Sequence, residues 1–125
     1  MAREACCRAK DWVSDVRGYL LAWGLPTVAL VGTAFAPPSV RTPAWLIALV
    51  WMGTACLANA RRCGRTHCHL TGPFFLVMAM AVPLHGYGLL PLGTHGWMWL
   101  GATIAGGGAL RWIASEGLLG RYWHR

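Results

Sequence analysis

The sequence predicts an all-α integral membrane protein with four transmembrane helices and both termini in the cytoplasm. Of its 125 residues, 56% are hydrophobic and only 12% are charged, whereas soluble domains are about 25% charged. No acid or base lies between Arg17 and Arg41, between Arg41 and Arg61, or between Arg65 and Arg111, which leaves stretches of 23, 19 and 45 residues. Because a spanning helix needs about 20 apolar residues, the first two stretches hold one span each and the third holds two.

The four spans can be placed along the chain. We expect them at residues 18–36, 43–60, 73–90 and 97–114. Helix-breaking residues mark the junctions, at Pro37-Pro38, Gly72-Pro73 and Pro91-Leu92-Gly93. A cleaved signal peptide ending at Ala36 is the alternative for the first span. Pro37 would then begin the mature chain, a position where proline is poorly tolerated, and the polar segment before the span is long for a signal peptide.

The basic residues predict the orientation. Ten of the eleven Lys and Arg residues lie in three places: the N-terminal segment 1–17, the loop 61–72, and the C-terminal flank that leads into the tail 115–125. Arg41 is the exception. Because Lys and Arg concentrate on the cytoplasmic side of membrane proteins, all three places are expected to be cytoplasmic. Orientation and contact with anionic lipid headgroups account for the net charge of +7, so no nucleic-acid partner is expected.

The loop 61–72 is the densest group of chemically reactive side chains. It contains Cys63 and Cys68 as candidate metal ligands and His67 and His69 as auxiliary ones. Cytoplasmic thiols stay reduced, so a disulfide framework is not expected, and thiolates select soft ions such as Cu(I), Zn(II) and Hg(II). Gly64 would let the loop close. In the alternative interpretation the arginines only set topology and the four ligand residues are incidental.

Three further positions complete the candidate site. Adjacent Cys6 and Cys7 can bind a linear soft ion and pass it on, the alternatives being S-palmitoylation or no role. Cys56 is interpreted as a small buried helix residue. His85 lies inside the third span, where a histidine indicates a functional site by default; it is a candidate relay, with a helix–helix hydrogen bond as the alternative. Pro26 and Pro83 are expected to kink their helices.

The remaining chemistry argues against an enzyme. The acidic residues are few, at Glu4, Asp11, Asp15 and Glu116, and none lies inside an expected span, so paired-carboxylate catalysis has no membrane-embedded site. The fourth span is rich in glycine and alanine, and its small residues at four-residue spacing allow close helix approach. This predicts a packing surface, within the chain or in a homo-oligomer.

The Cys6-Cys7 pair, the Cys63/Cys68 loop and the small multi-span format resemble the mercuric-ion transport proteins of bacterial mercury-resistance operons. This resemblance implies a multi-pass protein of the bacterial inner membrane that passes Hg(II) through paired cysteines to a cytosolic thiol acceptor protein. Two features depart from the family pattern. Cys6-Cys7 precedes the first span instead of lying in it, and the second pair has four residues between its cysteines, with histidines nearby. The chain therefore has no thiol at its outer face to start uptake.

The leading hypothesis is a membrane protein that binds a thiophilic heavy-metal ion through cytoplasmic cysteines and transports or delivers it. Its partners would be the lipid bilayer, the metal ion and a cytosolic acceptor. Two alternatives remain open. One is a non-catalytic structural or assembly subunit of a larger membrane complex, and the other is a membrane thiol-redox protein.

Overall fold

The computed structural model describes residues 7–120, and within this range the regular structure is helical throughout. A helical turn at residues 7–10 precedes the main elements. These are α2 (Val16–Tyr19), the π-helical turn η1 (Leu20–Gly24), α3 (Leu25–Gly32), α4 (Pro38–Cys63), α5 (Thr66–Gly86) and α6 (Gly96–Leu119). The all-α prediction is confirmed for the described part of the chain.

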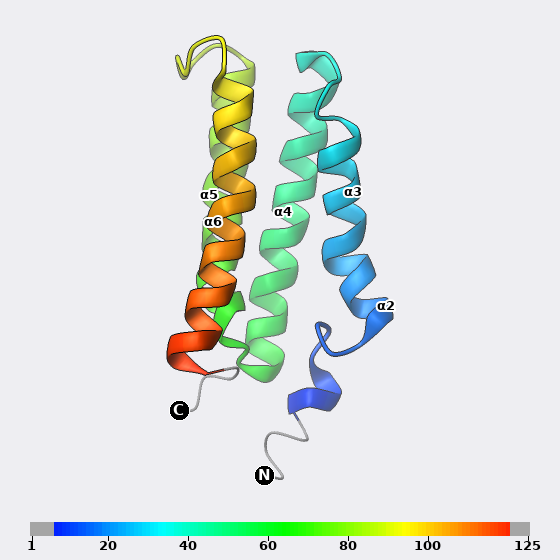
Figure 1. Cartoon of the computed structure of the whole chain (residues 1–125). Coiled ribbons are helices and arrows are strands. Elements are labelled where there is room, and N and C mark those ends of the chain that lie inside the picture. Colours follow the sequence, from blue (N-terminus) through cyan, green and yellow to red (C-terminus); the bar gives the residue numbers. More distant parts are fainter. Residues whose placement is uncertain (1–6, 121–125) are drawn as a thin grey trace.

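The helices form four rods that run up and down side by side (Figure 1). The first rod is α2, η1 and α3 in succession; α4, α5 and α6 are the other three. α3 packs on α4, α4 packs on α5, and α5 packs on α6. The turn between α4 and α5 lies at the same end as residues 7–10 and the last turn of α6, the lower end in Figure 1. We call this end the charged end, because Asp11, Arg65 and Glu116 meet there.

The first rod is continuous, but its geometry changes before Pro26. The ring of a proline inside a helix clashes with the carbonyl four residues earlier and removes one hydrogen bond. The five-residue π-helical turn η1 ends at Gly24, two residues before Pro26, so the widened turn takes up the distortion that the sequence predicts there. Ala22 and Trp23 of this turn are buried.

The segment expected as the loop 61–72 is almost wholly helical. α4 continues to Cys63, and α5 starts at Thr66, so only two residues connect them. Gly64 caps α4 with φ 65° and ψ 31°, a left-handed conformation that glycine adopts without steric cost. Pro73, expected at a junction, lies inside α5. The candidate ligands therefore have fixed positions on two antiparallel helices.

Two glycines let α4 and α5 approach closely. A Cβ atom added to Gly53 would lie 2.8 Å from the side chain of Leu76 and 3.1 Å from the Gly72 carbonyl. A Cβ added to Gly72 would lie 2.9 Å from the side chain of Leu57. Neither position has room for a side chain, which fixes the register of the hairpin.

The glycine-rich stretch of α6 packs mainly within the chain. A Cβ at Gly107 would lie 2.5 Å from the Phe74 ring, and one at Gly108 would lie 3.3 Å from the Phe75 ring. Gly106, in contrast, has open space around it. The small-residue surface that the sequence predicts on α6 therefore packs mainly against α5, and Gly106 lies outside this contact.

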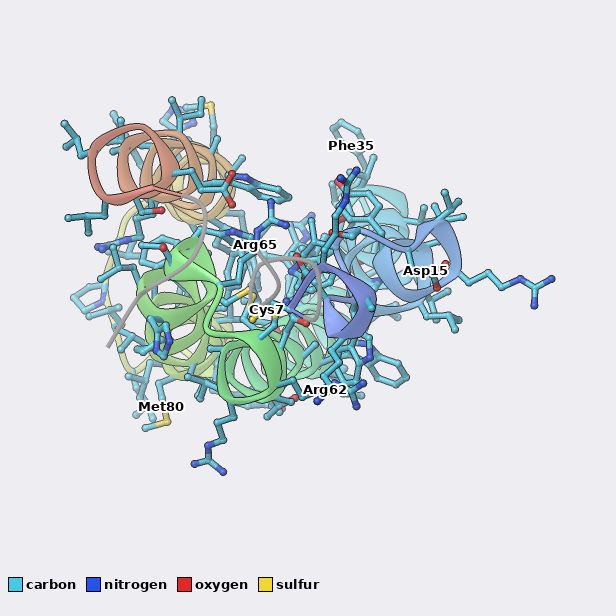
Figure 2. The ribbon with its side chains drawn as sticks, turned by 90° about the horizontal axis from the view of Figure 1, so that it is seen from below. Cys7, Asp15, Phe35, Arg62, Arg65 and Met80 are labelled. Atoms are coloured by element: carbon cyan, nitrogen blue, oxygen red, sulfur yellow. The ribbon has the colours of Figure 1, made fainter. Side chains whose placement is uncertain are left out.

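Large apolar side chains cover the outward faces of all four rods. Examples that are more than 60% exposed are Val28, Val31, Ile47, Val77, Met80, Met98 and Ile113. Two helices, α4 and α5, are long and apolar enough to cross a membrane, and Val16–Gly32 is a shorter apolar helix. Figure 2, seen from the charged end, shows Phe35 and Met80 at the periphery, and Cys7 and Arg65 near the middle.

Candidate functional site

The charged end is built around Arg65, the second residue of the α4–α5 turn. Its Nε donates to Glu116 Oε1 at 2.8 Å, and its Nη1 donates to Asp11 Oδ2. The side chain of Arg65 is 7% exposed, that of Asp11 is 0% exposed, and that of Glu116 is 19% exposed. Asp11 precedes the first rod and Glu116 lies near the end of α6, so one arginine joins the first and last rods.

The pKa values of the cluster show that all three groups are charged. Burial favours the neutral form of each carboxyl group and raises its pKa, but hydrogen bonds outweigh this effect. Asn59 and Arg65 donate to Asp11, and Arg65 and His67 donate to Glu116. The pKa values of both carboxyl groups therefore lie below their usual level. Burial lowers the pKa of Arg65, and the hydrogen bonds to Glu116 and Asp11 more than compensate, so its pKa is raised. The Glu116 carboxylate of this cluster lies beside His67.

Asn59 connects the ionic cluster to the thiols. Its fully buried side chain donates from Nδ2 to Asp11 Oδ1 at 2.8 Å, and its Oδ1 accepts the backbone N–H of Trp12 at 3.1 Å. The same Nδ2 lies 3.6 Å from Cys68 Sγ. Cys63 Sγ donates to the Asn59 backbone carbonyl at 3.2 Å. Asn59 therefore stands between Cys63 and Cys68.

His67 is held in one orientation by a carboxylate and an aromatic ring. Its Nδ1 lies 2.8 Å from Glu116 Oε1, and its ring stacks on Trp112 with centroids 4.2 Å apart and an angle of 3° between the planes. A carboxylate only accepts hydrogen bonds, so Nδ1 carries a proton and donates it to Glu116. In the neutral ring the lone pair is then on Nε2, which lies 3.3 Å from Cys68 Sγ.

Cys68 of α5 and Cys56 of α4 are neighbouring thiols, close enough for their side chains to interact. Both residues are completely buried. Cys56 Sγ also accepts a hydrogen bond from Trp23 Nε1 at 3.3 Å. A chain of contacts thus runs from Trp23 through both thiols and His67 to Glu116.

A groove lies between α3 and α6, and Cys56 and His67 are in its wall. Its volume is about 450 Å³, in the size range of small-molecule sites. Residues of α4 and α5 form its floor, including Met52 and Phe75. Cys68 lies behind Cys56 and is not among the lining residues. The thiol pair therefore has one member facing the groove and one facing His67.

The residues predicted from the sequence fall into separate places. Cys68 and His67 are in contact, as described above. Cys63 is buried on the far side of Asn59, and His69 is exposed on α5. Cys7 is half-buried at the charged end, where it lies within electrostatic range of Cys63. Cys6 lies outside the described residues.

His85 is far from this group. It lies near the last turn of α5, where its Nδ1 is 3.2 Å from the Leu90 carbonyl and its ring meets Trp97 edge to face. The Arg41 guanidinium lies over the Trp97 ring, 4.7 Å from its centroid. These contacts join the end of α5 to the start of α6 and the start of α4. The hydrogen bond of His85 is made to the loop after α5, and its contact with another helix is with the Trp97 ring.

Four residues of the site were not predicted: Cys56, Asn59, Asp11 and Glu116. A signal for Cys56 was present, because a helical hairpin that reverses at Gly64 brings Cys56 within about one turn of Cys68. A signal for the ionic cluster was present too. Arg65 falls at a buried helix turn, and a buried arginine requires carboxylates. Nothing in the local sequence identifies Asp11 and Glu116 as the two that meet it.

The arrangement offers two chemistries. Glu116, His67 and Cys68 follow the carboxylate–imidazole–thiol order of activated nucleophiles; although His67 and Cys68 are sequence neighbours, their reactive atoms meet. Cys68 is closed off from the groove, however, so a substrate there would reach Cys56 first. The second chemistry is metal binding by the thiol pair. Among residues 7–120 no three His, Cys, Asp or Glu side chains are grouped to hold one ion, which favours ions that need only two ligands.

Comparisons with protein-family models, with curated proteins and with solved structures find no match for this chain. The function is therefore argued from the geometry of the site.

Proposed function

We propose that the chain is a four-span membrane protein that binds a soft, thiophilic metal ion at the Cys56–Cys68 thiol pair and delivers it to the cytoplasmic side. The observation that carries this proposal is the pair itself: two fully buried neighbouring thiols, with the Nε2 atom of His67 3.3 Å from the sulfur of Cys68. Thiolate ligands select soft ions over hard ones. The metal ion is the cargo here, not a resident cofactor.

The four-span topology is part of this proposal. Among the described helices, α4 and α5 are long and apolar enough to cross a membrane, and we assign spans to the first rod and to α6 from their lengths and exposed apolar side chains. α4, α5 and α6 have 26, 21 and 24 residues, and the apolar helix Val16–Gly32 is at the short end of the spanning range of about 17 to 25 residues. Exposed apolar patches of this extent are unstable in water. The basic residues of the charged end support a cytoplasmic location for that end.

Charge balance favours Hg(II) among the soft ions. Two thiolates and one divalent ion have no net charge, so little charge has to be stabilised inside the bundle. Cu(I) would fit with one thiolate and one neutral thiol. A tetrahedral Zn(II) ion needs four ligands, which this pair does not supply. The resemblance of the cysteine pairs to mercuric-ion transport proteins favours the same ion.

Delivery would proceed toward the charged end. His67 would act as an auxiliary ligand through Nε2, and Glu116 would hold its ring, as carboxylates do for metal-binding histidines. Cys63 and Cys7 lie further along the same direction, past Asn59. We assign them, with Cys6, the passage to a cytosolic thiol acceptor.

The test is Hg(II) binding by the reduced, full-length protein in lipid nanodiscs. We expect one Hg(II) per chain by native mass spectrometry, with the near-ultraviolet absorption of a dithiolate complex. Cys56→Ser and Cys68→Ser should each abolish this absorption, while the matched variant Cys63→Ser should keep it. Loss in Cys63→Ser alone would contradict the assignment of the pair, and no thiol-dependent binding at all would favour the complex-subunit alternative.

One observation favours a thiol-redox function as the second candidate. Cys56 and Cys68 are neighbouring free thiols, and a disulfide formed between them on oxidation would serve such a function. Equilibration of the protein with glutathione buffers separates the two functions. A Cys56–Cys68 disulfide that forms near cytosolic potentials, in a protein that does not retain Hg(II), would favour the redox protein.

A further inference from the structure

We propose that the cargo reaches Cys56 sideways, from the lipid, as an uncharged and lipid-soluble complex that enters the groove between α3 and α6. This inference rests on the proposed function and adds the chemical form of the cargo and its route. It also answers a difficulty raised by the sequence, because a lateral route needs no thiol at the outer face.

The groove is apolar along its length. No Asp, Glu, Lys or Arg lines it; the polar lining residues are His67, Cys56, two threonines, and the aromatic Tyr and Trp side chains. A hydrated ion loses its water in such a space without compensation, which is costly. A neutral complex with apolar substituents loses little and gains contacts with the walls.

The groove opens between helices that do not touch. Within the described chain, α3 packs on α4 and α6 packs on α5, with no contact between α3 and α6. The lining residues on the two rims are exposed, Thr27 and Val31 on α3 and Ala105 and Ala109 on α6. In the proposed topology these rims face the acyl chains, so the opening leads to lipid.

The charged end is closed by aromatic rings. Tyr19 meets Trp112 across the groove with ring centroids 6.5 Å apart, and Trp112 stacks on His67. Behind them the ionic cluster of Asp11, Arg65 and Glu116 fills the space. Direct access to Cys56 from the water at this end would have to pass both layers.

The chemistry at the end of the groove is ligand exchange. With a neutral aryl or halide complex, a bond forms between Cys56 sulfur and mercury, the bond between mercury and chlorine breaks, and chloride and the thiol proton leave. Trp23 Nε1, which already donates to Cys56 Sγ, stabilises negative charge on that sulfur. Cys56 lines the groove and Cys68 does not, so Cys56 should react first.

The experiment compares two aryl mercurials on the wild-type protein in phosphatidylcholine nanodiscs. Phenylmercuric chloride is neutral, and 4-chloromercuribenzenesulfonate carries a fixed negative charge. Labelling of the Cys56 peptide is followed by mass spectrometry, and each rate is divided by the rate for the same peptide in denatured protein. We expect the neutral reagent to react at least about tenfold faster, which corresponds to about 1.4 kcal/mol in the barrier.

Two matched pairs of variants test the route itself. Ala105→Phe and Val31→Trp place a ring in the opening and should slow the neutral reagent about tenfold. Gly106→Phe and Val28→Trp add the same rings next to the opening; Gly106 has open space around it, and Val28 is 69% exposed, as is Val31. These controls should leave the rate unchanged, and the two pairs on different helices guard against a variant that does not fold.

The outcomes separate the route from the function. Equal rates for the two reagents, or rates unaffected by both Ala105→Phe and Val31→Trp, would overturn lateral entry. Chelation of Hg(II) by the Cys56–Cys68 pair does not depend on the route, so it would persist in that case. Loss of thiol-dependent Hg(II) binding in the wild type would overturn the function as well.

Discussion

Replacing Arg65 by glutamine should be among the most damaging single changes in the chain. Arg65→Gln keeps most of the side-chain length and removes the charge. It removes the Arg65 charge from beside the Asp11 carboxylate, which is 0% exposed. Removing one partner of a buried ion pair costs about 3–5 kcal/mol. Glu116 contributes less to this loss, because it is 19% exposed and keeps His67 as a partner.

The assay is reversible unfolding in mixed dodecylmaltoside–SDS micelles, followed by tryptophan fluorescence. Arg61→Gln removes the same charge from an exposed position on α4 and should change the free energy of unfolding by no more than about 0.5 kcal/mol. The double variant Arg65→Gln/Asp11→Asn should recover much of the loss, because it removes the buried carboxylate together with the charge of Arg65. A loss in Arg65→Gln no larger than that in Arg61→Gln would refute the buried cluster.

Three further predictions concern the same framework. The pKa values of Asp11 and Glu116 are lowered in the folded chain. Their contribution to stability should therefore be constant above the usual carboxyl pKa values and fall as the pH drops below about 4. A pH titration of the unfolding free energy checks this, and stability that rises on acidification would contradict it. Gly53→Val should destabilise the hairpin by about 1–3 kcal/mol, because the added Cβ atom would lie about 3 Å from side-chain and backbone atoms of α5. The control Gly106→Val should have little effect. Equal losses in the two variants would count against the tight α4–α5 contact. Gly64→Ala should lower the free energy of unfolding by about 1 kcal/mol, because Gly64 has a left-handed backbone conformation. The same unfolding assay measures this loss. A neutral result would mean that the backbone at residue 64 is not left-handed.

The helical fold could be predicted because apolar runs and charge gaps are local signals. Boundaries were harder to predict. Polar residues such as His67 and charged ones such as Arg61 were expected to end a span, yet both lie on helices, because hydrogen bonds and ion pairs satisfy polar groups at the charged end. Proline was an equally weak signal, since Pro73 lies within α5.

The candidate site was predicted only in part, for a different reason. Cys68 and His67 were identified from their proximity in sequence, which also suggested Cys63 as the partner of Cys68. On antiparallel helices, side-chain direction decides which groups meet, and it joins Cys68 to Cys56 instead. The contacts of Glu116 span 49 and 51 residues, a separation at which the sequence carries no local signal.

The two-residue turn between α4 and α5 has a consequence for the order of folding during synthesis. Contacts across this hairpin join residues that are near in sequence, so they can form early and at low entropic cost. The carboxylate of Glu116, by contrast, is made 51 residues after Arg65. Arg65 and His67 therefore lack the Glu116 carboxylate until α6 has been synthesised. Cys56 and Cys68 both lie in this hairpin and can come together early, whereas His67 gains the carboxylate that orients its ring only when α6 arrives.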